Sequence, residues 1–487
     1  MYKRKPIRNF IPWSFIAFCG FIGLERSPTK EIIELGNRRE IFVDNFLIEN
    51  LEGTKLVKHT PKDEGPVIYF DKPWESFAPA YITVLQDGDI YRAYYRGRHD
   101  IGNGKTTQNT CYAESKNGIN WEKPKLGIIE VNGSKANNVL LDTEPETHNF
   151  SPFIDKNPDV IPEQKYKAFG GSSTSGLIPY ASPDGIHWTR MQKEGVIKNG
   201  WLDSQNVSFW SESEEQYVCY FRSWTGGDTR GYRSVSRAVS SDFIHWSEPE
   251  EMSYGKTPFE HIYIQQTSPY FRAPHIYVAI GARFLPHRQI ITTEQLSDLK
   301  VDPSQFKGLS EPVFMTSRGG NLYDRTFMEA FIRPAIGRSN WSARTNYPAL
   351  NVVQTGPDEM SVYVNQDYAQ PTGHLHRYSM RLDGFTSLQA PYKGGTVLTK
   401  TFTFSGNELE VNFSTSAGGE IRIEIQDEAG NAIPGYSMEE SLPLIGNQTA
   451  GTASWKGSKS VSLLTSKPVR LLLFMKEANL YSFQFRQ

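Results

Sequence analysis

The stretch ASPDGIHWTRM (residues 181–191) recurs in variant form on both sides of itself. AESKNGINWEKP (113–124) precedes it, and AVSSDFIHWSEP (238–249) follows it. Each copy reads Ser-x-(Asp/Asn)-Gly-Ile-x-Trp or a close variant, and the closing residues are Trp121, Trp188 and Trp246. Similarity at a period of roughly 60 residues indicates a repeat architecture.

Two weaker copies extend the series to five. MTSRGGNLYDR (315–325) places Tyr323 at the anchor position, and YSMRLDGFTSL (378–388) places Phe385 there. Before each anchor lies an aromatic strand, and before that another strand with a polar opening. The aromatic strands are IYRAYYRG (90–97), KYKAFGG (165–171), QYVCYFRS (216–223), IYVAIGAR (276–283) and SVYVNQ (361–366).

Each unit therefore reads as a polar opening, a strand, a hairpin, an aromatic strand and a third strand that ends at the anchor. The hairpin turns are rich in Asp, Gly, Asn and Pro, as tight turns require. A fourth, outer strand is expected after each anchor. Four-stranded units repeated radially make a β-propeller, so the chain is predicted to be all-β with five blades.

The repeated motif is interpreted as scaffold rather than as a catalytic element. An Asp-Gly pair forms a tight turn because glycine adopts the backbone conformations that such turns need. The anchor Trp is expected to cover the hydrophobic edge of its blade and to pack on the neighbouring blade.

The pattern changes after Leu388. Two segments alternate with the period of a half-buried strand, with Arg422 and Glu424 expected to point outward. The apolar positions are Leu409, Val411 and Phe413, then Ile421, Ile423 and Ile425. We predict a β-sandwich over residues 393–487, after a propeller over 29–392. Residues 30–65 are expected to form a lead-in strand pair that packs on the propeller.

The first 28 residues carry a basic segment followed by a short apolar run, IPWSFIAFCGFIGL (11–24), which is typical of a secretory signal peptide. The alternatives are an uncleaved N-terminal anchor and a lipoprotein acylated at Cys19. Each places the protein outside the cytoplasm: secreted, periplasmic or at the cell surface. The three cysteines lack metal-ligand spacing and give no disulfide framework. A net charge of −2 gives no electrostatic reason for binding nucleic acid or an anionic membrane.

In a propeller the polar openings of the first strands are expected to converge at one mouth of the central channel. Four of these blade entries carry acids: Glu75, Asp203, Glu260 and Glu329. Paired carboxylates suit glycoside hydrolysis, where one protonates the glycosidic oxygen and the other acts as nucleophile or base. We predict Asp203 and Glu260 as the pair, with Glu75 and Glu329 as substitutes for either role.

Other polar and aromatic residues of the same openings are candidates for binding substrate. These are Trp74, His148, Asn149, Gln205, Asn206, His261, Arg96, Arg222, Arg283, Arg325, Arg333, Asn346 and Tyr347. Several arginines at one rim suit a carboxylate or sulfate group, so the predicted oligo- or polysaccharide substrate includes acidic sugars. No cofactor or catalytic metal is expected, and a structural calcium ion in the central channel is not indicated.

The pattern resembles the five-bladed propeller glycoside hydrolases of the arabinanase/β-xylosidase and invertase/levanase groups. Its motifs are more similar to secreted bacterial proteins labelled only as glycosyl-hydrolase-like. These motifs are IFVDNFLIE (41–49), CYAESKNGINWEKPKLG (111–127), MEAFIRP (328–334) and EIQDEAGNAIPGYS (424–437). The invertase motif Trp-x-Asn-Asp-Pro-Asn-Gly is absent, so the resemblance does not imply fructan specificity.

The leading functional hypothesis is a secreted glycosidase that acts at the end of a poly- or oligosaccharide and takes part in polysaccharide degradation. A second reading is a non-catalytic glycan-binding propeller. A third is a polysaccharide lyase, with His148 or Tyr347 as base and arginines that neutralise a uronate.

Overall fold

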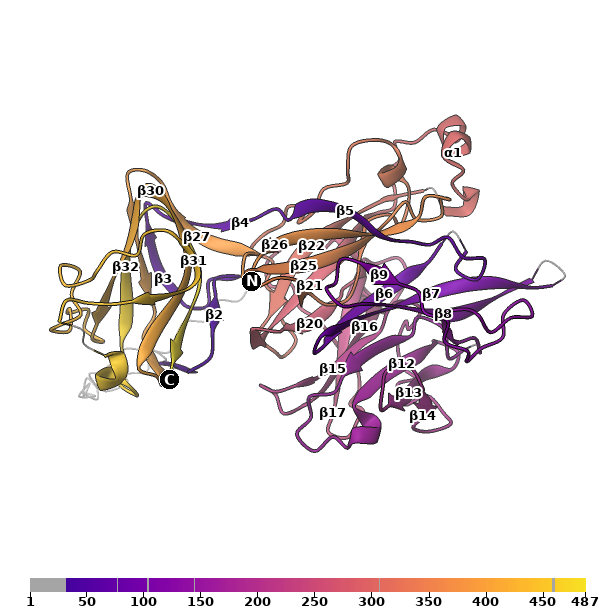
Figure 1. Cartoon of the computed structure of the whole chain (residues 1–487), viewed down its shortest axis with the longest axis horizontal. Helices are drawn as coiled ribbons and strands as arrows, with labels where there is room; N and C mark the ends of the chain where they lie inside the picture. Colours follow the sequence, from indigo (N-terminus) through magenta and orange to yellow (C-terminus); the bar gives the residue numbers. More distant parts are fainter. Residues whose placement is uncertain (1–31, 77, 103–104, 144, 306, 458–459) are drawn as a thin grey trace, which may run out of the picture.

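The computed structural model describes residues 32–487 except 77, 103–104, 144, 306 and 458–459. The predicted signal peptide or anchor at residues 1–28 lies outside the described residues. Strands dominate the described part, where the only α-helix is α1 (Thr293–Leu299). The blades and the C-terminal sheet lie beside each other along the long axis (Figure 1).

Five antiparallel sheets form the predicted five-bladed β-propeller. Blade one holds β6 (Ala80–Asp87), β7 (Ile90–Gly102), β8 (Lys105–Ser115), β9 (Trp121–Glu122) and β10 (Val139–Leu141). Blade two holds β11 (Ser151–Ile154), β12 (Tyr166–Ser172), β13 (Gly176–Ser182) and β14 (Thr189–Arg190). Blade three holds β15 (Val207–Ser211), β16 (Gln216–Trp224), β17 (Arg233–Ser240) and β18 (Glu250–Glu251).

Blades four and five complete the ring. Blade four holds β19 (His261–Ile264), β20 (Thr267–Tyr270), β21 (Ala273–Leu285) and β22 (Leu309–Ser317). Blade five holds β23 (Tyr347–Pro348), β24 (Val353–Gln354), β25 (Glu359–Gln366), β26 (His374–Arg381) and, from the N-terminal side, β5 (Lys62–Tyr69). Backbone hydrogen bonds join blade five to blade one: Leu350 N donates to Ile82 O at 2.8 Å, and Val84 N donates to Leu350 O at 3.1 Å.

The repeated motif forms the same turn in successive blades. Asp184 Oδ1 accepts the backbone N–H groups of Ile186 and His187, each at 2.8 Å. Gly185 has a φ of +75°, which glycine adopts without steric cost. The third copy places Phe243 at this position with a φ of +68°, and there Ser240 Oγ accepts the Phe243 N–H at 2.9 Å.

Each anchor Trp packs edge-on against an aromatic residue of the preceding blade, as predicted. Ring centroids are 6.0 Å apart for Trp121 and Tyr363, 6.4 Å for Trp188 and Tyr94, and 5.7 Å for Trp246 and Phe169. Such pairs add to the stability of the contact beyond the burial of their area. The motif is therefore the joint between blades.

The C-terminal strands belong to one eight-stranded sheet. It consists of β2 (Glu40–Ile41), β3 (Ile48–Glu52), β4 (Lys55–Lys58), β27 (Thr386–Ala390), β28 (Gly395–Thr399), β30 (Glu408–Gln426), β31 (Asn447–Ala453) and β32 (Arg470–Arg486). A separate parallel pair joins β1 (Ile33–Gly36) to β29 (Phe402–Phe404), and both sheets contribute to one hydrophobic core.

The predicted burial of the six apolar positions of β30 is confirmed, but the intervening Glu410 and Asn412 are buried too, so burial does not alternate cleanly. Glu424 departs from the expectation that it points outward. It is buried and accepts hydrogen bonds from Gln426 Nε2 at 2.7 Å and from Met438 N at 3.0 Å. The prediction was wrong here because a carboxylate whose hydrogen bonds are made inside the protein can be buried.

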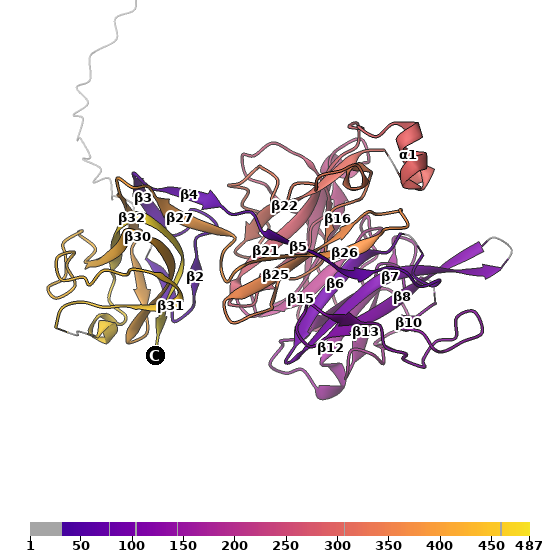
Figure 2. The ribbon, with the colours of Figure 1, turned by 45° about the horizontal axis from the view of Figure 1, so that its top comes forward.

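The N-terminal strands differ from the predicted lead-in pair. Strands β1 to β4 each pair with a C-terminal strand, and only β5 joins the propeller. Figure 2 shows the indigo β3 and β4 among the orange and yellow strands. An exposed strand edge has unpaired backbone N–H and C=O groups, which can pair with any strand that lies beside it. The local sequence of a strand does not show which strand that is.

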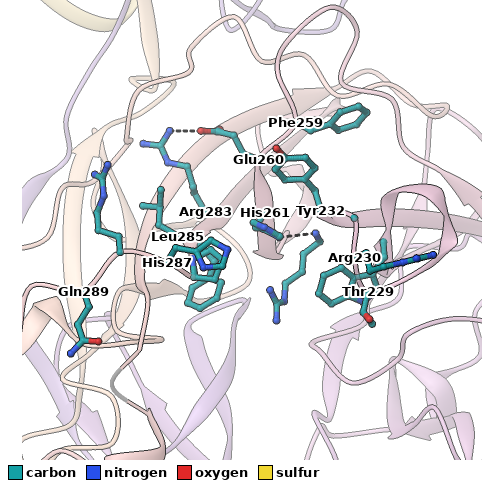
Figure 3. Close-up of a pocket in the computed structure, with 16 residues that line it drawn as sticks. Thr229, Arg230, Tyr232, Phe259, Glu260, His261, Arg283, Leu285, His287 and Gln289 are labelled. Carbon is teal, nitrogen blue, oxygen red and sulfur yellow. Dashed lines mark hydrogen bonds and ion pairs between the residues drawn. The ribbon is translucent and has the colours of Figure 1, made fainter.

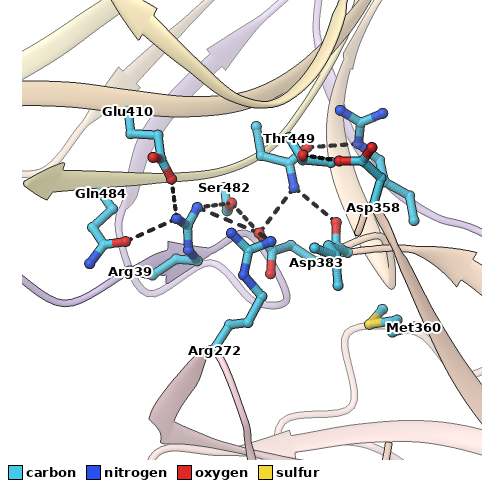
Figure 4. Close-up of polar contacts among 12 residues, drawn as sticks. Arg39, Arg272, Asp358, Met360, Asp383, Glu410, Thr449, Ser482 and Gln484 are labelled. Atoms are coloured by element: carbon cyan, nitrogen blue, oxygen red, sulfur yellow. Dashed lines mark hydrogen bonds and ion pairs between the residues drawn. The ribbon is translucent and has the colours of Figure 1, made fainter. Parts of the chain in front are cut away.

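Asp383, the turn aspartate of the fifth copy, joins the propeller to the C-terminal sheet (Figure 4). Its buried carboxylate accepts hydrogen bonds from Tyr270 Oη at 2.8 Å and Ser482 Oγ at 2.6 Å. Arg272 Nη1 lies 3.1 Å away, and Arg39 Nη1 lies 3.6 Å away. Blade four, the N-terminal segment and β32 thus meet at one carboxylate.

Candidate functional site

A cavity of about 510 Å³, here called the funnel, opens at one end of the ring. Every blade contributes a residue that lies in its first strand or just before it: Tyr81, His148, Asp203, Tyr263 and Tyr347. The remaining lining includes Arg96, Arg98, His99, Asp100, Thr106, Asp302, Gln305, Arg344 and Tyr368. The funnel is therefore where the polar openings of the blades meet.

Asp203 presents an accessible carboxylate to the funnel, since 67% of its side chain is exposed. Its Oδ1 lies 3.0 Å from His148 Nε2, and its Oδ2 lies 3.4 Å from Arg222 Nη2. The hydrogen bond with His148 and the charge of Arg222 outweigh partial burial and hold the pKa of Asp203 below its ordinary value. The carboxylate is thus ionised at neutral pH, as a base or nucleophile must be and a proton donor must not.

Four tyrosines and two arginines form much of the funnel wall. Tyr81, Tyr263, Tyr347 and Tyr368 are mostly buried and pack in one cluster. The Arg96 guanidinium lies 4.7 Å from the Tyr81 ring centroid, and that of Arg344 lies 5.8 Å from the Tyr263 centroid. Burial raises the pKa of Tyr81, so its phenol stays neutral. Neutral hydroxyls and ring faces beside cations suit a sugar with an anionic substituent.

The backbone at the funnel is strained. Ser76, Tyr81 and Arg344 line it with φ values of +62°, +55° and +61°, and all three are non-glycine residues. Asn149 and Asn346, next to lining residues in the chain, have φ values of +55° and +68°. Such conformations cost about 1–3 kcal/mol each and cluster at functional sites.

Several predicted substrate-binding residues form the buried layer beneath the funnel. Gln266 Nε2 donates to Gln205 Oε1 at 2.7 Å, and Gln205 Nε2 donates to Thr83 Oγ1 at 2.9 Å. Asn206 and Asn346 donate to backbone carbonyls and are likewise buried. These amides position the first strands, and none of them lines the funnel.

Asn149 and Arg222 support the residues that do line it. Asn149 Nδ2 donates to Ser204 O at 2.9 Å, and Arg96 Nη1 donates to Asn149 Oδ1 at 3.1 Å. Arg222 contacts Asp203. The structure therefore brings Asp203, His148, Arg96 and Tyr347 together in the funnel and places Asn149 and Arg222 directly behind them.

Glu75, the acid predicted for the mouth of blade one, does not line the funnel. It is fully buried, with Oε2 2.8 Å from Lys123 Nζ and Oε1 accepting from Tyr95 Oη at 2.6 Å. Its neighbour Trp74 donates from Nε1 to Asn138 Oδ1 at 2.6 Å. A carboxylate enclosed by a lysine and a tyrosine holds the blade together and does not contact a substrate.

Glu260 lines a second cavity, of about 1000 Å³, between blades three and four, here called the lateral groove (Figure 3). Its two oxygens each lie 2.7 Å from a guanidinium nitrogen, one of Arg283 and one of Arg325. His261 lies beside it in the same groove. Asp203 and Glu260 thus line two different cavities, which separates the predicted pair.

Glu329 and Arg333 stand on an exposed loop and line neither cavity. The Glu329 backbone carbonyl accepts from Lys58 Nζ at 3.0 Å, so this loop rests against the N-terminal strand β4. The expectation that four acids gather around one opening therefore holds for Asp203 alone.

Some funnel residues have no counterpart among the sequence-predicted site residues. Tyr263 lies in β19 of blade four, two residues after the predicted His261, in a segment that the sequence had already indicated. Asp302 and Gln305 come from the insertion between β21 and β22, and Asp100 comes from the long β7–β8 hairpin. Insertions outside the repeat give no periodic signal.

Two kinds of feature are absent from the part of the chain that the structure describes. In this part of the chain, no three or more His, Cys, Asp and Glu side chains are grouped so that they could hold a metal ion. None of its helices combines the length and apolar character needed to span a bilayer.

Comparison with known sequences gives one distant relative, and no family model matches the chain. An uncharacterized protein of Mycobacterium tuberculosis is 25% identical over 170 residues, which cover 34% of this chain. The match spans about half (48%) of that relative's length.

Comparison with solved structures finds carbohydrate-active proteins. A glycoside hydrolase is 11% identical and has a TM-score of 0.43, covering 66% of this chain and 92% of its own. An N-acetylgalactosamine deacetylase from F. plautii is 12% identical with a TM-score of 0.43, covering 68% and 96%. A β-1,2-mannobiose phosphorylase from Listeria innocua is 8% identical with a TM-score of 0.44, covering 68% and 98%. At these scores and identities the likeness assigns neither an activity nor a substrate to this chain.

Proposed function

We propose that the protein is a carbohydrate-active enzyme that binds the end of a glycan chain in the funnel and cleaves a glycosidic bond there. The observation that carries this proposal is the exposed, ionised Asp203 at a mouth to which all five blades contribute. A blind funnel favours a chain end, because a continuous polymer needs an open cleft. Tyrosine faces and arginines in the wall supply the stacking and charge that acidic sugars require.

Within this proposal Asp203 is the nucleophile or the base that activates water. Its lowered pKa suits both roles. The proton donor then comes from the other carboxylates of the funnel, which are Asp100 and Asp302. Glu260 takes no part in the bond cleavage, since it faces the lateral groove between two arginines.

The test is an incubation with digests of acidic and neutral polysaccharides, followed by analysis of the released sugars. Asp203→Asn should abolish release and leave the fold intact, whereas Glu260→Gln should retain it. Asp159→Asn, at an exposed aspartate in the β11–β12 connection, is the matched control. Unchanged turnover in Asp203→Asn would refute the assignment.

Asp100→Asn and Asp302→Asn identify the proton donor. The variant that lacks the donor should lose activity on substrates with poor leaving groups far more than on aryl glycosides, which need no protonation. Equal losses on both substrate classes in both variants would exclude these two residues.

A polysaccharide lyase is the second candidate, and the three arginines that line the funnel beside tyrosine hydroxyls favour it. In that reaction an arginine neutralises the uronate carboxylate, and His148 removes the α-proton, since burial raises the pKa of Tyr81 and Tyr347 and keeps their phenols protonated. An unsaturated product that absorbs in the near ultraviolet distinguishes elimination from hydrolysis. Binding without any product would instead identify a non-catalytic glycan-binding protein.

Export is part of the same proposal. An enzyme that degrades polysaccharides acts outside the cytoplasm, and the basic-apolar start of the chain is typical of a secretory signal. The mass of the protein recovered from the producing cells and their medium shows whether residues 1–28 are removed or acylated.

A further inference from the structure

The lateral groove carries an excess of positive charge. Four arginines and two histidines line it, and Glu260 is its single lining carboxylate. They are Arg230, Arg233, Arg283, Arg288, His261 and His287. Glu260 pairs with Arg283 and Arg325, and Arg230 pairs with Asp228 at 2.7 Å, so none of these carboxylates balances Arg233.

Arg233 is the cation that the fold leaves without a counter-charge. Among the described residues it forms no ion pair with a carboxylate, and its Nε is buried without a hydrogen-bond partner. Its guanidinium lies 4.6 Å from the ring centroid of Trp224 and 5.1 Å from that of Tyr263. A half-buried guanidinium held by ring faces alone has its donors available for an anion.

Exposed aromatic rings stand beside this cation. Tyr232 and Phe259 are 44% and 53% exposed, and their stacked rings lie 6.1 Å apart at an angle of 21°. His261 Nδ1 accepts the Arg233 backbone N–H at 3.0 Å, so the neutral imidazole carries its proton on Nε2 and can donate it. The groove thus combines ring faces, a donor and an unpaired cation (Figure 3).

The groove and the funnel meet at Tyr263. This residue lines the funnel, while Arg233 of the groove and Arg222, the partner of Asp203, both lie over its ring. A chain whose end reaches Asp203 therefore has a cationic surface next to it over blades three and four.

We propose that the lateral groove is a second glycan-binding site, which holds an anionic sugar unit of the chain whose end occupies the funnel. Arg233 binds the carboxylate or sulfate group, and Tyr232 and Phe259 contact the sugar face. The inference rests on the proposed function in that the ligand is a glycan whose end occupies the funnel, and it does not require that a bond is cleaved there.

The test measures binding by calorimetry with the full-length protein carrying Asp203→Asn, so that no probe is consumed. The probes are tetrasaccharide fractions of polygalacturonate, alginate and chondroitin sulfate. Each is paired with its carboxyl-reduced or desulfated counterpart and with its monosaccharide. We expect at least one anionic tetrasaccharide to bind at least tenfold more tightly than its neutral counterpart and its monosaccharide.

Arg233→Gln should remove that tenfold advantage, and Arg233→Lys should restore part of it. Arg338→Gln, at an exposed arginine outside both cavities, should bind like the parent protein. If Arg233→Gln fails to fold, Tyr232→Ser at the exposed ring replaces it and should weaken the same probe at least fivefold.

Three results would overturn the groove site. They are equal affinity for charged and neutral tetrasaccharides, equal affinity for a tetrasaccharide and its monosaccharide, and full affinity in the Arg233 and Tyr232 variants. The uronate and sulfate arms identify the anionic group. Failure of the proposed reaction is a separate result, because a protein that releases no product from any digest would still show the charge-dependent binding.

Discussion

His148 Nε2 lies 3.0 Å from Asp203 Oδ1, across the boundary between the second and third blades. Both side chains come from the segments that enter first strands, so the hydrogen bond exists only when the two blades are docked. His148 Nδ1 in turn lies 3.1 Å from Gln108 Oε1 of blade one. Three blades therefore determine the orientation of the ring that holds the candidate catalytic carboxylate.

We expect this hydrogen bond to set the acidic limit of the proposed activity. Since it lowers the pKa of Asp203, the carboxylate stays ionised as the pH falls through the ordinary aspartate value of about 3.9. We expect the acidic limb of kcat/KM that Asp203 contributes to lie below this pH, and to move upward in His148→Ala. A pH–rate profile that is the same in both proteins would contradict this role for His148.

Glu75 should matter for stability rather than for chemistry. Replacing it by Gln removes one ion pair of Lys123, which still has Asp71 3.1 Å away, and disturbs the buried hydrogen bond from Tyr95, so the loss should be about 1–3 kcal/mol. Urea denaturation measures the loss. Glu329→Gln, at the exposed loop, is the control and should change the free energy of unfolding by less than about 0.5 kcal/mol.

The blade joints predict a large effect at Trp188. Trp188→Ala removes the edge-on contacts with Tyr94 and Phe150 and should destabilise the protein by about 3–5 kcal/mol. Thermal unfolding measures the loss. Trp201→Ala, at an indole that is 40% exposed, should cost far less, and equal losses would contradict the joint.

The turn aspartates predict a pH-dependent loss of stability. Burial alone would raise the pKa of Asp184, but hydrogen bonds from His187 and from two backbone N–H groups outweigh it and hold this pKa well below the ordinary value. The stabilisation is therefore complete above about pH 3.9 and is lost as the pH falls through the lower folded-state pKa.

Asp184→Ala should accordingly have a lower Tm than the wild type at neutral pH, and the difference should shrink in strong acid. Asp159→Ala, an exposed aspartate outside the motif, is the control and should show no such trend. A difference in Tm that does not change with pH would mean that the carboxylate charge is not what stabilises the turn.

The ring could be predicted from the sequence because each blade repeats a local signal. The turn motif consists of residues close together in the chain, which are Asp184, Gly185 and Trp188 in blade two. Its hydrogen bonds are local, so the turn needs no distant partner. The fourth and fifth copies depart further from the motif, although the fifth keeps Asp383, and their aromatic anchors Tyr323 and Phe385 still pack on the preceding blades.

The site could be predicted only where a residue belongs to the repeat. Asp203 and His148 open first strands, so their convergence follows from the topology. Glu75 and Glu260 occupy similar places in the chain but turn toward Lys123 and Arg283, because a carboxylate near a buried cation pairs with it. Sequence spacing does not reveal which of two nearby cavities a side chain faces.

The pairing of early strands with late strands has a consequence for synthesis. Glu40 of β2 is opposite Phe483 of β32, and Tyr69 of β5 is opposite His374 of β26. On the ribosome these early strands emerge long before their partners exist, and their edges stay open until β26 and β32 have been translated. A nascent chain that stalls after blade four can close neither assembly, so premature termination should give insoluble fragments instead of a smaller working propeller.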